Sequence, residues 1–447
     1  MKKFFTTLSN IWKIEDLRVR IINTLLFLLI YRVGSFVVLP GVDHASLNDQ
    51  KAATGLAGLI NMFAGGSFSR SSIFALGVMP YISASIVMQL LGIAVPYFSK
   101  MQKEGESGRS KINQWTRYLT IAITAPQAVA YLHSQIPADT LLMPYTTFVI
   151  LNTFVLTAST LFVMWLGEKI TDKGIGNGIS LIIMVGIIAS LPSAFMVEFE
   201  SRTTGQGGLI TFIVELVALL GVVMFTILIV QGTRKIAVQY AKRIVGNKQY
   251  GGVRQYIPLK VTAAGVMPII FAQALMFIPA SIASFFPSMA SNSILISLSN
   301  YNSWLHNLLF ALLIIVFTYF YTAITVNHNQ MADDMKKNSG FIPGVKPGKA
   351  TADYIDDVIS RITLPGSIFL AIVAIIPALV SLAGVSSLFS RFFGGTSLII
   401  LVQVVLDTLQ QIESHLLMRH YDGLMKTGRI KGRTAIPAAP GTTPTAI

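Results

Sequence analysis

Residues 210–231 read ITFIVELVALLGVVMFTILIVQ, and residues 232–258, which follow directly, read GTRKIAVQYAKRIVGNKQYGGVRQYIP. The first stretch is nearly uncharged and is long enough to cross a bilayer, since a spanning helix needs about 20 mostly apolar residues. The second stretch carries only positive charges. The same alternation of uncharged stretches with short charged loops continues along the chain, and it predicts a polytopic membrane protein.

The composition agrees with this prediction. Of the 447 residues, 53% are hydrophobic and only 12% are charged, whereas soluble domains carry about 25% charged residues. The chain has no cysteine. This excludes disulfides, thiolate nucleophiles, iron–sulfur clusters and zinc sites built from cysteine. We expect an all-α membrane protein without a metal or cofactor, whose first span serves as its own signal anchor because residues 1–20 lack a cleavable signal pattern.

Ten stretches of the sequence satisfy the length and hydropathy expected of a spanning helix. They are residues 21–39, 72–95, 118–137, 147–167, 177–197, 210–231, 259–286, 307–328, 362–384 and 394–416.

The basic residues fall in every second loop. Of the 34 Lys and Arg, 29 lie on one side of the predicted membrane, and the other side holds Lys51, Arg70, Arg202 and Arg391, with Arg32 inside the first span. Cytoplasmic loops carry an excess of Lys and Arg. With an even number of spans, both termini are therefore predicted in the cytosol, and the protein is expected in the inner (cytoplasmic) membrane. Nucleic-acid binding is a weaker interpretation of the same charge.

Four regions follow from this topology. Residues 1–20 form an amphipathic cytosolic N-terminus, residues 21–200 an N-terminal half of five spans, residues 201–416 a C-terminal half of five spans, and residues 417–447 a cytosolic tail with a disordered end. Two large cytosolic loops interrupt the C-terminal half at residues 232–258 and 330–361. Together the stretches 231–260 and 330–361 contain 12 of the 29 basic residues.

One apolar segment is too short to span. Residues Gly55 to Gly66 read GLAGLINMFAGG, and an apolar run of about a dozen residues is more often re-entrant or interfacial than spanning. Two interpretations remain open, a surface loop with a few apolar residues and a short mobile helix inside a cavity on the outer side. Glycines would let such a helix pack closely.

Catalytic signatures are weak. The six histidines are scattered, and Gly344-Val-Lys-Pro-Gly348-Lys349 departs from a phosphate-binding loop in its spacing and in having Ala350 in place of Ser or Thr. Gly105-Glu-Ser107-Gly108 resembles the serine motif of intramembrane proteases but lies in a charged loop. The main ionisable groups inside spans are Arg32, Asp407 and Glu413. Their positions favour a structural or partner-facing role over ion coupling.

Six long strings, in order along the chain, carry a family resemblance. They are GGSFSRSSIFALGVMPYISASIVMQLL (65–91), KEGESGRSKINQWTRY (103–118), WLGEKITDKGIGNGISLII (165–183), PLKVTAAGVMPIIFA (258–272), FIPGVKPGKATADYIDDVISRITL (341–364) and FGGTSLIILVQVVLD (393–407). These strings resemble the SecY family, which supplies the pore subunit of the bacterial protein-export channel. The resemblance covers about residues 10–432. It implies ten transmembrane helices in two inverted five-helix halves, with a central hourglass pore and a re-entrant plug helix.

The resemblance assigns roles to particular residues. It implies a plug near residues 58–70, with Leu59, Ile60, Met62, Phe63, Gly65, Gly66 and Arg70. It implies an apolar pore ring of Ile82, Ile86, Ile183, Ile187, Ile270 and Ile400. The first two pairs of this ring are spaced i, i+4 and therefore share a helix face, and a tight apolar constriction blocks ions by dewetting. Ordinary packing or lipid-facing isoleucines are the alternative.

The resemblance also implies a lateral gate, between the second and third spans on one side and the seventh and eighth on the other. Polar residues that could line it are Gln89, Thr124, Gln127 and Gln273. The two large loops are candidate docking sites through Arg234, Lys235, Lys242, Arg243, Lys248, Arg254, Lys336, Lys337, Lys346 and Lys349. Solvated charge that only sets the topology is the alternative there.

The function expected from the resemblance is passage of unfolded secretory proteins across the membrane, with lateral release of hydrophobic segments. It implies as partners the SecE and SecG subunits, the SecA ATPase, the ribosome, signal peptides and nascent chains, and membrane lipids, with YidC and SecDF as further partners. No catalysis is expected. A secondary transporter with an inverted-repeat fold and an intramembrane enzyme are the competing hypotheses, which midplane ion sites or a catalytic pair inside the spans would support.

Overall fold

The computed structural model describes residues 14–43, 61–136, 141–204, 208–240, 243–245, 248–250, 254–285 and 293–426. Within these ranges ten helices have at least 16 residues, and they match the ten predicted spans one to one. They are α2 (Glu15–Gly34), α4 (Met79–Ala94), α6 (Glu106–Gln135), α7 (Tyr145–Lys173), α8 (Gly178–Thr204), α9 (Gly208–Val230), α10 (Met267–Phe285), α12 (Trp304–Thr325), α14 (Lys349–Leu382) and α16 (Gly395–Lys426). The predicted all-α class of the membrane bundle is confirmed.

Six of the described helices are individually long and apolar enough to cross a membrane, and a seventh span results if α4 and the short α5 (Pro96–Lys103) count as one. The first helix, α2, is not among them because every 18-residue stretch of it contains at least three charged residues, namely Arg18, Arg20 and Arg32. The structure is that of a multi-pass membrane protein whose less apolar helices pack against the others.

Prolines set the limits of the second span. Pro80 lies in the first turn of α4, where a missing backbone N–H leaves no hydrogen bond unmade. The helix therefore begins at Met79, and the predicted span 72–95 was too long at its start. Ser72 instead forms a β-bridge with Val38. At the other end Pro96 opens α5, whose axis is bent by 102° from α4.

The two large loops are not irregular. Strand β1 (Thr233–Tyr240) pairs antiparallel with β4 (Arg254–Lys260), and the short β5 (Gly340–Phe341) adds to the other edge of β1. Strands β2 (Arg243–Val245) and β3 (Lys248–Tyr250) form a second pair. The rest of the second loop is largely helical, since it holds α13 (His328–Lys337) and the first turns of α14. Neither these strands nor the early start of α14 can be predicted from hydropathy.

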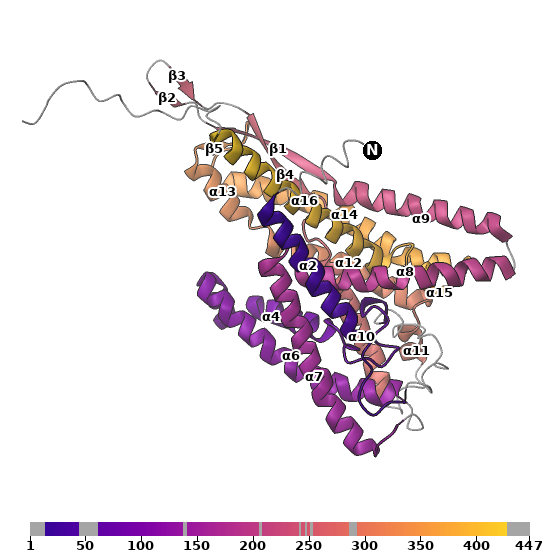
Figure 1. Ribbon diagram of the computed structural model, residues 1–447. Coiled ribbons are helices and arrows are strands. Elements are labelled where there is room, and N and C mark those ends of the chain that lie inside the picture. The colour runs from indigo at the N-terminus through magenta and orange to yellow at the C-terminus, as the bar shows by residue number, and fades with distance from the viewer. Residues whose placement is uncertain are drawn as a thin grey trace, which may run out of the picture.

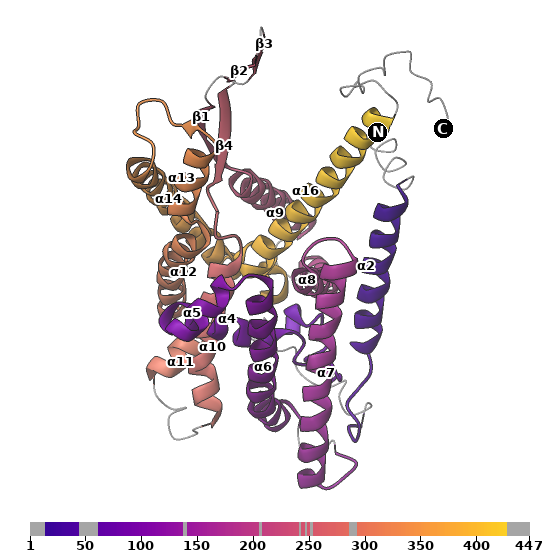
Figure 2. The same cartoon turned by 90° about the vertical axis from the view of Figure 1, so that its left-hand side faces the viewer.

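The two loops share one small core. Ile236 and Val238 of β1 pack with Met335 of α13 and with Ile355 of α14 in a single buried cluster. Figure 2 shows β1, β4, α13, the start of α2 and the end of α16 gathered at one end of the bundle. We call this end the strand-bearing end. The excess of Lys and Arg in its loops predicts that this end is cytosolic.

Three apolar cores hold the helices together. Figure 1 shows the arrangement of the helices that they join. One core joins α10, α12, α14 and α16, and a second joins α6 and α7 to residues 39–42 and 64–76. The third lies between them and draws on α2, α7, α8 and α16, together with α15 (Ser387–Ser390). This central core contains the residues discussed next.

Candidate pore, plug and gate

Helices α4, α8, α10 and α16 bring five of the six predicted ring isoleucines together. Ile183 and Ile187 of α8 and Ile400 of α16 are all buried members of the central core. Ile82 of α4 and Ile270 of α10 are partly buried and pack against it. Ile86, also on α4, is buried but is not a member of this core.

The predicted plug segment lies against this ring. Met62 and Phe63 belong to the same core as Ile183 and Ile187, and they are 4% and 6% exposed. Between those two isoleucines lies Gly186, whose Cα is so close to the plug backbone that an added β-carbon would be 3.0 Å from the carbonyl carbon of Phe63. The absence of a side chain at residue 186 is therefore what admits the segment.

From residue 61, where the description resumes, the plug segment is helical over residues 61–63 and continues as turns. Gly65 and Gly66 have φ angles of +64° and +84°, which glycine adopts at little cost. The turns explain why the predicted helix over residues 58–70 is shorter within the described part. Leu59 and Ile60, also predicted plug residues, lie outside the described residues.

Two arginines hold the turn. Arg32 Nη1 from α2 and Arg70 Nη2 from the segment itself each donate a 2.8 Å hydrogen bond to the carbonyl oxygen of Gly65. Both guanidinium groups also face the ring of Phe36, at 4.9 and 4.5 Å from its centroid. Cation–π contacts of this kind contribute about 0.5–2 kcal/mol. Arg32, predicted to have a structural or partner-facing role, thus ties the first span to the plug segment.

Among the described residues, one hydrogen bond crosses the predicted lateral gate. The hydroxyl of Tyr321 on α12 donates to Oε1 of Gln89 on α4 at 3.1 Å, which joins the second span to the eighth. Gln273 of α10 is buried and Gln127 of α6 is half-buried. Thr124 donates within its own helix, to the carbonyl of Thr120.

Tyr321 was missed by sequence analysis, because a single tyrosine in a span carries no periodic signal. The described contact joins Gln89 to α12, and Gln89, Thr124, Gln127 and Gln273 all stay predictions as gate residues.

The predicted docking residues occupy the outside of the strand-bearing end. The members whose side chains the structure describes are all exposed, and they are Arg234, Lys235, Arg254, Lys336, Lys337, Lys346 and Lys349. Arg243 and Lys248 lie on the paired strands β2 and β3, and Lys242 lies outside the described residues. Because β1 joins both loops through β4 and β5, the two predicted docking loops form one surface.

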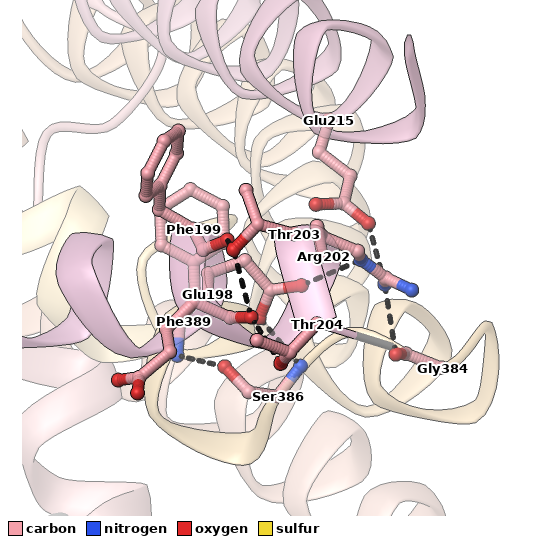
Figure 3. A network of polar contacts seen from close by, with 10 residues as sticks. Glu198, Phe199, Arg202, Thr203, Thr204, Glu215, Gly384, Ser386 and Phe389 are labelled. Atoms are coloured by element: carbon pink, nitrogen blue, oxygen red, sulfur yellow. Dashed lines mark hydrogen bonds and ion pairs between the residues drawn. The ribbon is translucent and has the colours of Figure 1, made fainter. Parts of the chain in front are cut away.

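A buried ionic network at the opposite end was also missed (Figure 3). Arg202 donates through Nε to Glu198 at 2.9 Å and through Nη2 to Glu215 at 2.6 Å and to the carbonyl of Gly384 at 2.8 Å. Glu198 also accepts from the backbone N–H of Ser386. The network links α8 to α9 and to the loop that follows α14. Its sequence signal was the i, i+4 spacing of Glu198 and Arg202.

One of the two acids predicted in the last span has a nearby base. Asp407 lies 3.8 Å from Lys260 Nζ and accepts a hydrogen bond from Gln403. The side chains of Asp407 and Lys260 are 47% and 43% exposed, so the pair contributes little to stability.

The sequence of this chain is similar to those of known proteins over most of its length. The family model described as SecY matches residues 72–409. The protein translocase subunit SecY of Streptomyces scabiei is 41% identical, over 94% of this chain and all of its own length. That of Halalkalibacterium halodurans is 43% identical over the same shares.

Two solved structures have a similar fold. One is described as the structure of a protein conducting channel, with a TM-score of 0.64 and 18% identity over 89% of this chain and 92% of its own. The other is Sec61 in the canine ribosome–channel complex from the endoplasmic reticulum, with a TM-score of 0.60 and 17% identity over the same shares. At these identities the structural match concerns the fold alone.

Proposed function

The chain belongs to the SecY family, and from this premise we propose that its helices enclose the pore through which unfolded secretory proteins cross the cytoplasmic membrane. The observation that carries the proposal is the buried contact between the plug segment and the ring isoleucines, which we call the seat of the plug segment. Met62 and Phe63 are buried against isoleucines that come from separate helices. A resting protein-conducting channel must block ions, and an apolar constriction closed by a displaceable plug can do so.

In the resting state the ring and the plug segment exclude ions together. An apolar constriction gates by dewetting and needs no charge. When a polypeptide occupies the pore, Met62 and Phe63 leave their contact with the ring, and the ring isoleucines surround the moving chain. When the chain has passed, the plug segment returns to the ring. Burying its apolar side chains there is favourable because it removes them from water.

Hydrophobic segments leave sideways through the lateral gate. The gate contact between Gln89 and Tyr321 is a neutral hydrogen bond, and interhelical bonds of this kind in membranes average only about 0.6 kcal/mol. A bound signal helix that gains lipid contact can offset this amount easily. Thr124, Gln127 and Gln273 are proposed to line the same seam.

The strand-bearing end is proposed as the cytosolic docking surface, with both termini on that side. Its lysines and arginines attract acidic protein surfaces and ribosomal RNA alike, so the SecA ATPase and the ribosome are the proposed partners. The match to the ribosome-bound Sec61 fold supports this choice. Lys346 contributes a point charge there and lacks the bidentate fork of an arginine.

The energy for transport comes from such partners, because the chain itself is proposed to catalyse no covalent step. SecE and SecG are proposed to lie beside the channel in the membrane, and YidC and SecDF to cooperate with it. The secondary-transporter hypothesis is not favoured, given the family match over residues 72–409.

The experiment that tests the gate uses the absence of native cysteines. Gln89→Cys combined with Tyr321→Cys places one thiol on α4 and one on α12. A bismaleimide spacer joins them better than a disulfide, because the present contact is between the ends of two long side chains. Crosslinking is expected to stop export of a secretory substrate into membrane vesicles.

The matched control is Arg117→Cys with Glu168→Cys, which replaces a 2.7 Å ion pair between α6 and α7. Crosslinking this pair should leave export intact. If the locked Gln89–Tyr321 pair exports as well as the control, the proposed gate is wrong.

A further inference from the structure

Beside the plug segment lies a cavity of 260 Å³ whose lining is strongly positive. Three arginines line it, each from a different part of the chain: Arg32 of α2, Arg70 of the plug segment, and Arg391 of the loop between α15 and α16. Neither Asp nor Glu occurs among the described residues of the lining. The remaining wall is made of small, polar or apolar side chains.

Its positive groups are held close together. Arg32 and Arg70 share one acceptor, the carbonyl oxygen of Gly65, through bonds of 2.8 Å each. A neutral carbonyl does not neutralise two guanidinium charges. Burial, and next the nearby charge of Arg32, lower the pKa of Arg70 from its ordinary value. The positive charges of Arg32 and Arg70 therefore repel each other, and no acidic side chain among the described lining residues compensates them.

Further donors belong to residues that line the same space. The Nε of Arg70 and the hydroxyl of Ser69 are buried and have no protein partner within the described structure. Asn61 also lines the cavity, and its Oδ1 accepts from the backbone N–H of Ser69 at 2.9 Å. Its amide N–H groups are the donors that remain. Guanidinium, amide and hydroxyl donors around one cavity are the set that binds an oxyanion.

We propose that this cavity binds one small free oxyanion of the phosphate or sulfate class. The anion bridges α2, the plug segment and the loop that precedes α16, so its binding favours the seated position of the plug segment. This site goes beyond the proposed transport function, because anion binding to the resting protein requires no substrate, motor or ribosome.

The test measures binding of ³⁵S-sulfate to the purified complex in phosphatidylcholine nanodiscs at constant ionic strength. We expect saturable binding of one sulfate per chain and competition by unlabelled phosphate. Ser193 lines the cavity without bonding the plug segment, since its hydroxyl donates to Ser190 within α8. Ser193→Asp adds a carboxylate to the wall and should weaken sulfate binding at least about tenfold, whereas Ser193→Asn should bind like the wild type.

A second pair of variants controls for loss of binding through misfolding. Arg70→Gln removes one of the cavity's charges and should weaken binding, while Arg109→Gln, at an exposed site near the start of α6, should not. Absence of saturable binding, or equal binding by Ser193→Asp and Ser193→Asn, overturns the proposal. Displacement by phosphatidylglycerol nanodiscs but not by phosphate would also overturn it, since the occupant would then be a lipid headgroup. These outcomes do not depend on export.

Discussion

Gly186 lies in α8 at the contact with the plug segment, and its replacement by alanine isolates the seat of that segment. An alanine β-carbon would overlap the carbonyl oxygen of Phe63 and would lie 3.0 Å from its carbonyl carbon and 3.1 Å from Gly65 N. These are backbone atoms, which cannot rotate out of the way as a side chain would. Either the plug segment or α8 must move.

The size of the effect follows from packing. Overfilling a well-packed contact by one methyl group costs about 1–3 kcal/mol. If the strain is relieved by unseating the plug segment, the ratio of seated to unseated forms falls by about 5- to 150-fold. Alanine also favours a helix over glycine by up to about 1 kcal/mol. Thermal stability therefore has no definite expected sign, and ion conductance is the informative measurement.

The assay is ion leak through resting channels reconstituted in liposomes, with no substrate present. Gly186→Ala should raise the leak at least about fivefold. The matched control is Gly221→Ala in α9, where an added β-carbon would meet no atom within 4 Å. Equal leak from wild type, control and Gly186→Ala would refute the claim that the plug segment seals the pore through this contact.

Further predictions concern the ring, the ionic network and the docking surface. Ile400→Ser, at a site only 2% exposed, should raise ion leak and tolerance of defective signal sequences, whereas Ile150→Ser, at a site 56% exposed, should change neither. Glu198→Gln removes one partner of a buried ion pair and should lower the free energy of unfolding by about 3–5 kcal/mol; an unchanged denaturation midpoint would contradict the structural role. Arg254→Glu should weaken binding of SecA or ribosomes to vesicles about threefold or more at low salt. Lys100→Glu, outside both docking loops, is its control, and equal losses would point to general surface charge.

Much of the bundle could be predicted because hydropathy and basic-residue counts are local properties. The span at residues 210–231 was predicted nearly to its observed ends, Gly208–Val230. The predicted helix ends were wrong where a helix extends beyond its apolar part. Helix α14, for example, begins at Lys349 rather than at residue 362. Amphipathic turns outside the membrane are helical without being apolar, so hydropathy does not detect them.

The candidate site could be predicted only in part. The i, i+4 spacing of Ile183 and Ile187 placed both on one face of α8, but spacing does not tell which face points to the pore. The family resemblance supplied that choice, and the central core is consistent with it. The partner of Gln89 could not be predicted, because Tyr321 is 232 residues away in the chain.

By itself, the sequence determined a polytopic helical protein with one basic face, because the bilayer acts on each segment separately through its length, polarity and charge. Only the tertiary structure decided which residues meet. Gly186 admits the backbone of Phe63, Arg32 reaches the carbonyl of Gly65, and Arg202 joins Glu198 to Glu215. Such contacts depend on helix rotation and on the path of non-helical turns, and no single segment encodes either of these.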